Sequence, residues 1–66
     1  MPDYRCYVLD RVHRIIFPME IEAEDLGAAV RHGLKVLHEV QTRNPYSGAE
    51  NIEIWEGTVR VFPLRR

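Results

Sequence analysis

The closing segment of the chain constrains its fold more than any other part, because it has the pattern of a β-hairpin. Two runs rich in aliphatic and aromatic residues, 52–55 and 58–62, flank the pair Glu56-Gly57. If that pair forms a two-residue turn, every cross-strand pair that the turn creates is chemically compatible. The segment therefore predicts two antiparallel strands whose register can be counted from the turn.

This register predicts which side chains of the hairpin share a face. Side chains alternate along a strand, so the count places Trp55 and Phe62 on one face together with the opposite charges of Glu53 and Arg60. The other face carries the aliphatic residues Ile52, Ile54, Val59 and Val61, which we expect to be buried. Both faces of the hairpin are therefore substantially apolar.

Two further strands are predicted before the middle of the chain. Residues 4–9 are rich in aromatic and β-branched side chains, and residues 14–23 alternate between apolar and polar positions. Pro18 cannot donate to a ladder, so it predicts a bulge or an edge position and a strand that divides in two. One face of the second strand is expected to be buried, with Ile15, Phe17, Met19, Ile21 and Ala23. A turn over residues 10–13 joins the two strands, although no glycine marks it.

The pattern becomes helical from residue 26 to about residue 43. One apolar stripe contains Leu26, Ala29, Val30, Gly33, Leu34, Leu37 and Val40. Asp25 is the predicted N-cap, and Asn44-Pro45 ends the helix because the residue before a proline avoids the helical region. Gly33 costs about 1 kcal/mol relative to alanine inside a helix, so we expect a compensating close approach of helix and sheet.

These elements occur in the order ββαββ and predict a single α+β domain over residues 1–66. The expected architecture is a two-layer sandwich, in which one helix covers one face of a four-stranded antiparallel sheet. A chain of 66 residues is near the size at which one core contributes only a few kcal/mol of net stability. Further burial against a partner is therefore favourable.

Composition and charge narrow the range of partners. The formal net charge is −1, from ten acidic and nine basic side chains spread over both halves of the chain. No basic region is present that would concentrate a nucleic acid or an acidic membrane surface. No apolar run approaches the roughly 18 residues that span a bilayer, and the lone Cys6 fits a reducing compartment. We therefore expect a cytoplasmic protein.

The sheet face that the helix leaves open is the predicted interaction surface. It is expected to display Tyr7, Leu9, Ile16, Trp55, Arg60 and Phe62. Self-association as a homodimer would bury these aromatic rings. Alternatively, unstacked bases of a nucleic acid would stack on Tyr7, Trp55 and Phe62 beside Arg5 and Arg60. The slightly negative net charge favours the homodimer over a nucleic acid. A third interpretation is that these side chains are exposed without a partner, or that the tail of the chain covers them.

No residue pattern predicts catalysis, a metal site or a cofactor, so we expect a protein that is not an enzyme. His32 and His38 are six positions apart on the helix and do not converge, and His13 and Cys6 lie elsewhere. Glu20, Glu22 and Glu24 form one solvated strand face in the simplest interpretation. Pro2, once Met1 is removed, would present the secondary amine that short-chain tautomerases use as a base, but their element order differs.

Four segments carry a resemblance: residues 4–10, 14–16, 21–25 and 53–57. They resemble a group of short, uncharacterised bacterial proteins, conserved hypotheticals with a domain of unknown function. Members carry Asp-Gly where this chain has Val12-His13, and the resemblance implies no activity. A weaker, topological likeness is to HicB-type antitoxin folds, which implies an alternative function as an antitoxin-like protein that binds a toxin partner.

Overall fold

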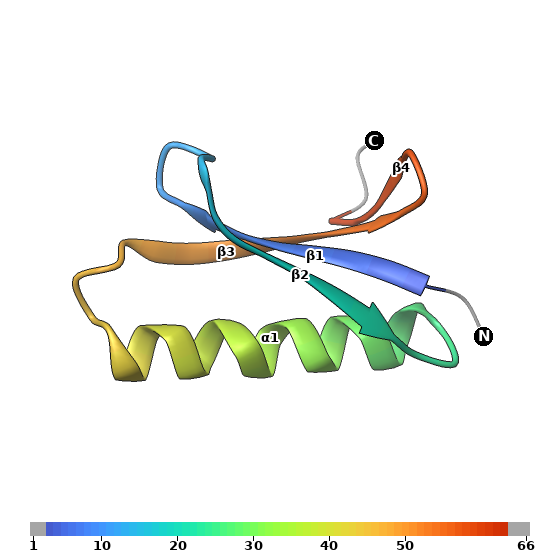
Figure 1. The fold of residues 1–66 in the computed structure, drawn as a ribbon, viewed down its shortest axis with the longest axis horizontal. Helices are drawn as coiled ribbons and strands as arrows, with labels where there is room; N and C mark the ends of the chain where they lie inside the picture. The colour runs from blue at the N-terminus through green and yellow to red at the C-terminus, as the bar shows by residue number, and fades with distance from the viewer. Residues whose placement is uncertain (1–2, 64–66) are drawn as a thin grey trace.

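The computed structural model describes residues 3–63 and has the predicted two-layer α+β architecture. The elements are β1 (Asp3–Asp10), β2 (Ile15–Glu22), α1 (Leu26–Arg43), β3 (Ala49–Glu56) and β4 (Val59–Phe62). The four strands form one antiparallel sheet in the order β2-β1-β3-β4. Helix α1 runs along one face of this sheet, and within residues 3–63 no second layer covers the opposite face (Figure 1).

The core lies between α1 and the two central strands. Its buried members are Tyr4, Cys6, Val8, Ile21, Ala23, Ala29, Ala49, Ile52 and Ile54. On β1 the buried residues alternate with exposed or half-buried ones as far as Val8, which is the period of a strand with one covered face. The predicted burial of the aliphatic residues of β3 is thereby confirmed.

Gly33 marks the closest approach of α1 to the sheet. A Cβ atom added at this residue would lie 2.8 Å from the Cδ1 atom of Ile52 and 3.2 Å from both the Sγ atom of Cys6 and the Cδ1 atom of Ile54. Contacts this short leave no room for a methyl group. The expected compensation for a glycine in the helix interior is confirmed.

Helix α1 begins and ends where the sequence predicts. The Asp25 side chain accepts a hydrogen bond of 2.8 Å from the backbone N–H of Ala28, and Asp25 itself has extended backbone angles. This is the N-cap arrangement that satisfies one of the free N–H groups of the first turn. At the other end, the N–H of Asn44 donates to the carbonyl of Val40 before Pro45.

The turn of the closing hairpin lies one residue later than predicted. Glu56 pairs with Val59 and Trp55 pairs with Arg60, so the two turn residues are Gly57 and Thr58. Gly57 has a φ of 62°, and a glycine with positive φ at the first turn position is the signature of a type II′ turn. Because glycine prefers this position, the turn begins one residue later, and each β3 residue pairs with a β4 residue two positions further along than predicted.

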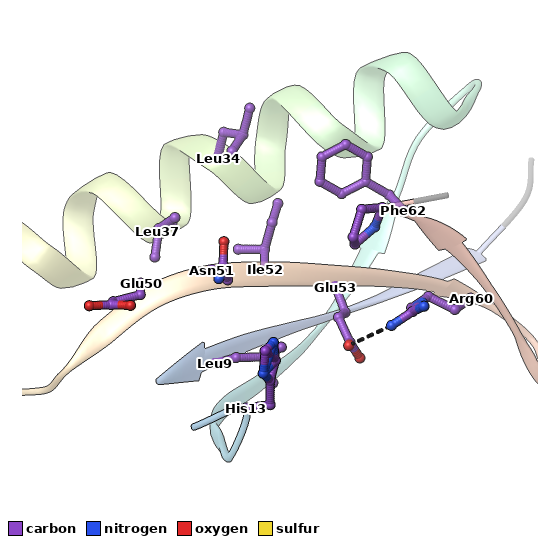
Figure 2. A pocket seen from close by; sticks show the side chains of 11 residues that line it. Leu9, His13, Leu34, Leu37, Glu50, Asn51, Ile52, Glu53, Arg60 and Phe62 are labelled. Atoms are coloured by element: carbon purple, nitrogen blue, oxygen red, sulfur yellow. Dashed lines mark hydrogen bonds and ion pairs between the residues drawn. The ribbon is translucent and has the colours of Figure 1, made fainter. Parts of the chain in front are cut away.

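A bulge then places Phe62 on the opposite face from the one predicted. The shift of two residues alone would leave every side chain of β4 on its predicted face, but Ile54 pairs with Phe62 across an irregularity that inserts one residue. Phe62 therefore points toward the helix, on the same side of β3 as Ile52 and Leu34 (Figure 2). The prediction that Phe62 shares the open face with Trp55 is wrong.

Three apolar residues predicted to be buried are instead exposed. Ile15, Phe17 and Val59 are 56%, 45% and 60% exposed. Both hairpins bend away from α1 (Figure 1), and the helix packs mainly on β3. The start of β2 and the start of β4 therefore extend beyond the surface that the helix covers.

Strand β2 is an edge strand, and it is continuous through Pro18. Pro18 pairs with Tyr7 within an unbroken register, and the irregularity lies instead at Ile16, where Val8 pairs with Phe17 but Leu9 pairs with Ile15. A proline tolerated in a paired strand directs its nitrogen to the free side. The edge position predicted from Pro18 is confirmed, and the division of the strand is not.

The turn between β1 and β2 is organised by the carboxylate of Asp10. Its Oδ1 atom accepts hydrogen bonds of 2.9 Å from the backbone N–H groups of Val12 and Arg14. His13 completes the turn with a φ of 65°, and its N–H donates to the carbonyl of Asp10 at 3.0 Å. A type I turn followed by a left-handed residue is a common hairpin connection in which glycine usually occupies the last position. An Asp-Gly pair at residues 12–13 would place its glycine at this left-handed residue.

Replacing His13 with glycine is expected to raise the free energy of unfolding by about 0.5–1 kcal/mol. The left-handed conformation costs an L-residue about 1–2 kcal/mol, and part of that gain is lost to the greater freedom of glycine in the unfolded chain. Urea denaturation followed by circular dichroism measures the difference. His13→Ala is the control, because alanine keeps the penalty. A glycine variant no more stable than the alanine variant would contradict this account of the turn.

Candidate interaction surface

The open face of the sheet, called the trough from here on, lies between two raised hairpins. The β1–β2 turn and the β3–β4 turn lie at opposite ends of the sheet, and both rise on the side away from α1 (Figure 1). A shallow hollow of about 330 Å³ lies on this side near β2, lined by residues that include Arg5, Tyr7, Pro18 and Glu20. No helix or second sheet formed by residues 3–63 packs against the trough.

One row of side chains crosses the trough through all four strands. Glu20 pairs with Arg5, Arg5 with Trp55, and Trp55 with Arg60. Directly paired residues share a face and lie about 5 Å apart, so the row reads acid, base, aromatic ring, base from β2 to β4. The adjacent row contains Pro18, Tyr7 and Glu53.

The carboxylate of Glu53 fixes the two residues at the β4 end of this row. Its Oε1 atom accepts a hydrogen bond of 3.1 Å from the Nε1–H of Trp55, and its Oε2 atom lies 3.1 Å from Nη1 of Arg60. The side chains of Arg60 and Glu53 are only 21% and 20% exposed, so water screens this pair less than a surface pair. The indole and the guanidinium are therefore held in defined positions on the open face.

The structure brings together only part of the predicted interface. Tyr7, Trp55 and Arg60 lie half-buried on the open face, as predicted. Leu9 lies on that side of β1 but is only 2% exposed, because it lies under the raised β1–β2 hairpin beside His13 (Figure 2). Phe62, as described above, lies on the other face of the sheet.

The β1–β2 hairpin carries two exposed apolar residues that were not predicted on this surface, Val12 and Ile15, which are 63% and 56% exposed. Ile16, which was predicted on the open face, is 38% exposed and lies at the bulge of β2. Ile15 pairs with Leu9 and therefore faces the open side, because of the bulge at Ile16. Valine is unusual in a turn, so Val12 was the one signal in the sequence that pointed to exposed apolar residues here. These residues extend the apolar part of the trough to its β1–β2 end.

A cavity of about 340 Å³ lies beside the part of β3 that β4 does not reach. Strand β4 pairs only with residues 54–56, so within residues 3–63 no strand pairs with the outer edge of β3 over residues 49–53. The lining includes Leu34, Leu37, Ile52 and Phe62 on the helix side and Glu53 and Arg60 on the open side (Figure 2). The lining also contains the side chains of His13 and Glu50, and the polar pair that it holds in direct contact is Glu53 with Arg60.

Groups with metal-binding or nucleophilic chemistry are dispersed. Residues 3–63 contain no group of three or more His, Cys, Asp or Glu side chains placed to hold a metal ion. Cys6 is a free, fully buried thiol, and burial raises its pKa to about 11. Burial, followed by the charges of Glu56 and Asp25, also raises the pKa of Tyr4. Pro2, considered above as a catalytic amine, lies outside the described residues.

The buried thiol of Cys6 predicts a loss of stability in alkali. An unfolded chain releases this proton near the ordinary pKa of 9.0 and the native chain near 11, so between these values the native state binds more protons. The free energy of unfolding therefore falls as pH rises through this range, by at most about 1.4 kcal/mol per pH unit for one group.

Urea denaturation at pH 8, 9 and 10 measures this slope, and Cys6→Ala should reduce it but not abolish it, since Tyr4 contributes in the same direction. The native thiol should also react with Ellman's reagent only as fast as the chain opens. An unchanged slope in Cys6→Ala, or rapid labelling of the native protein, would contradict the assignment.

None of the helices formed by residues 3–63 combines the length and the apolar character needed to cross a bilayer. The chain matches no described protein family, no curated protein and no solved structure.

Proposed function

We propose that this chain is a non-enzymatic interaction module of the cytoplasm, which self-associates as a homodimer through the open face of its sheet. The observation that carries the proposal is the trough itself, where Tyr7, Trp55 and Ile15 present apolar surface on a sheet face with no second layer. Natural sheets with two apolar faces bury both of them. The free thiol of Cys6 fits a reducing compartment.

The small size of the core supports this assembly. Among the described residues, the largest fully buried side chains are Ile21, Ile54, Val8 and Cys6. A core of this size leaves a small net stability after the conformational entropy of the chain is subtracted. Association of two native chains adds stability through mass action, because only the native state carries the trough.

The charge of the open face opposes the nucleic-acid alternative. Within residues 3–63, the pairing of β1 and β2 places Asp3, Glu20 and Glu22 on the same face as Arg5, and β3 and β4 add Glu53 and Arg60. Four acidic side chains therefore outnumber two arginines, one of which is already paired with Glu53. A polyanion gains little on such a surface.

Pairing through the free edge of β2 is a less favourable route to a dimer than stacking of the faces. The nitrogen of Pro18 lies at that edge and donates no hydrogen bond, so an added strand would lose a ladder bond at its centre. The proline thus protects the edge while it leaves the open face available.

Analytical ultracentrifugation over about 1–100 µM tests the proposal. The wild-type chain should sediment as a dimer in the upper part of this range, and Trp55→Arg should weaken the dimer at least about tenfold by placing a charge in the buried face. Tyr46→Arg is the matched control, because Tyr46 is an aromatic residue that is 96% exposed in the loop after α1. A wild-type monomer at all concentrations would overturn the proposal.

A further inference from the structure

We propose that the second copy stacks on the trough about a two-fold axis parallel to the strands. In this dimer Glu20 of each chain faces Arg60 of the other, and Arg5 faces the ring of Trp55. The arrangement rests on the proposed self-association and specifies its geometry, which decides which residues determine whether two copies recognise each other.

The row Glu20, Arg5, Trp55 and Arg60 crosses all four strands at one height of the sheet. A two-fold axis that runs along the strands reverses the order of the strands in the upper sheet, so that β2 of one chain lies over β4 of the other and β1 lies over β3. The position along the strands is unchanged. The row therefore meets its own reverse, and each of its four members faces a different member of the partner's row.

The facing pairs of this row are complementary. Glu20 opposes a guanidinium, and Arg5 lies over an indole face, which favours a cation. In the adjacent row, Tyr7 faces Glu53, whose carboxylate can accept from the phenol hydroxyl. Each contact occurs twice because the interface is two-fold symmetric.

The other in-plane axis, perpendicular to the strands, is opposed by the same charges. It would stack each β2 on the partner's β2, and with the axis running through the row, Glu20, Arg5 and Arg60 would each face their own copies. Like charges across an interface repel and suppress that arrangement. The charge pattern therefore discriminates between the two ways of stacking these sheets.

The raised hairpins also fit the strand-parallel axis. The β1–β2 turn lies at the end of the sheet where β3 begins, since Asp10 pairs with Ala49. The axis carries the partner's turn to the outer side of β3 at this end, where β4 is absent and the cavity lined by Ile52 and Phe62 lies. The exposed Val12 and Ile15 of the partner's hairpin would thus approach apolar surface.

A charge exchange tests the geometry separately from the existence of the dimer. Glu20→Arg and Arg60→Glu should each weaken homodimerisation about tenfold or more, because each creates two like-charge pairs. Mixed in equal amounts, the two variants should form a heterodimer with an affinity within about threefold of wild type, since both pairs are then complementary. Glu39→Arg is the control, because it makes the same charge change on the exposed surface of α1.

A cross-linking experiment keeps the test decisive if Arg60→Glu perturbs the hairpin. Facing sheets lie about 10 Å apart, so a short bis-maleimide should join Glu20→Cys to Arg60→Cys in a mixture. It should not join Glu20→Cys to itself, because the two β2 strands are separated by roughly 14 Å across the sheet in addition to the spacing between sheets. Wild-type dimers with no heterodimer preference and no mixed cross-link would overturn the geometry alone, whereas a wild-type monomer would overturn the proposed function.

Discussion

Replacing Gly33 with valine is expected to lower the free energy of unfolding by at least about 3 kcal/mol, which is most of the stability of a domain this small. Even a methyl group at this position would lie 2.8 Å from the Cδ1 atom of Ile52 and 3.2 Å from the Sγ atom of Cys6. Valine adds two further carbon atoms and a branched side chain that is stiff in a helix. To admit it, α1 must move away from the sheet and lose its contacts with β3.

Alanine at position 33 separates the steric effect from helix propensity. It gains about 1 kcal/mol of intrinsic helix stability over glycine, so a net loss shows that the contacts with the sheet dominate. Gly27→Ala is the matched control, because a Cβ atom there meets only the Oδ1 atom of Asp25 at 3.4 Å and the side chain of Arg31 at 3.6 Å. Urea denaturation should show stabilisation of Gly27→Ala and destabilisation of Gly33→Ala. Equal stabilisation of both would show that the helix and the sheet are not in close contact at Gly33.

The elements of the fold were predictable because each has its own hydrophobic period. The change from a period of two to 3.6 at residue 26, the cap at Asp25 and the proline at residue 45 all lie where the structure has element ends. Even the reason for Gly33 was accessible, since a glycine inside an apolar stripe needs a close neighbour. These signals are local, so they depend little on the rest of the chain.

The faces of the strands were less predictable because a bulge changes the parity of a strand. One inserted residue turned Phe62 to the helix side, and another turned Ile15 to the open side. A two-residue alternation contains no marker for either insertion. Tyr7 and Trp55 were placed correctly on the open face because β1 and β3 pair in continuous register between them. Arg60 was placed correctly because it lies between the turn and the bulge of β4.

Burial along β2 depends on where the helix lies over the sheet, which the sequence does not encode locally. Phe17 and Ile21 occupy equivalent positions in the alternation, and both were expected in the core. The helix packs mainly on β3 and leaves the start of β2 uncovered, so Ile21 is 1% exposed and Phe17 is 45% exposed. Phe17 instead lines a groove of about 420 Å³ with Met19, Val36 and Val40.

Truncation of these two residues to alanine should therefore have very different effects. Ile21→Ala is expected to cost about 3–4 kcal/mol, because it removes three buried carbon atoms and leaves a cavity under α1. Phe17→Ala removes a larger side chain but should cost less than about 1.5 kcal/mol, because nearly half of its surface already contacts water. Urea denaturation at a single low protein concentration measures both values.

Substitutions at Phe17 and Trp55 distinguish the stability of the chain from the stability of the proposed dimer. Phe17 faces the helix side of the sheet, opposite Val8, so its truncation should leave the sedimentation of the dimer unchanged at concentrations where both variants are folded. Trp55 is only half-buried within the chain, yet its replacement should act mainly on association, because the second copy covers its remaining surface in the proposed dimer. A Phe17→Ala variant that dissociates while it remains folded would instead assign the partner to the groove between β2 and α1.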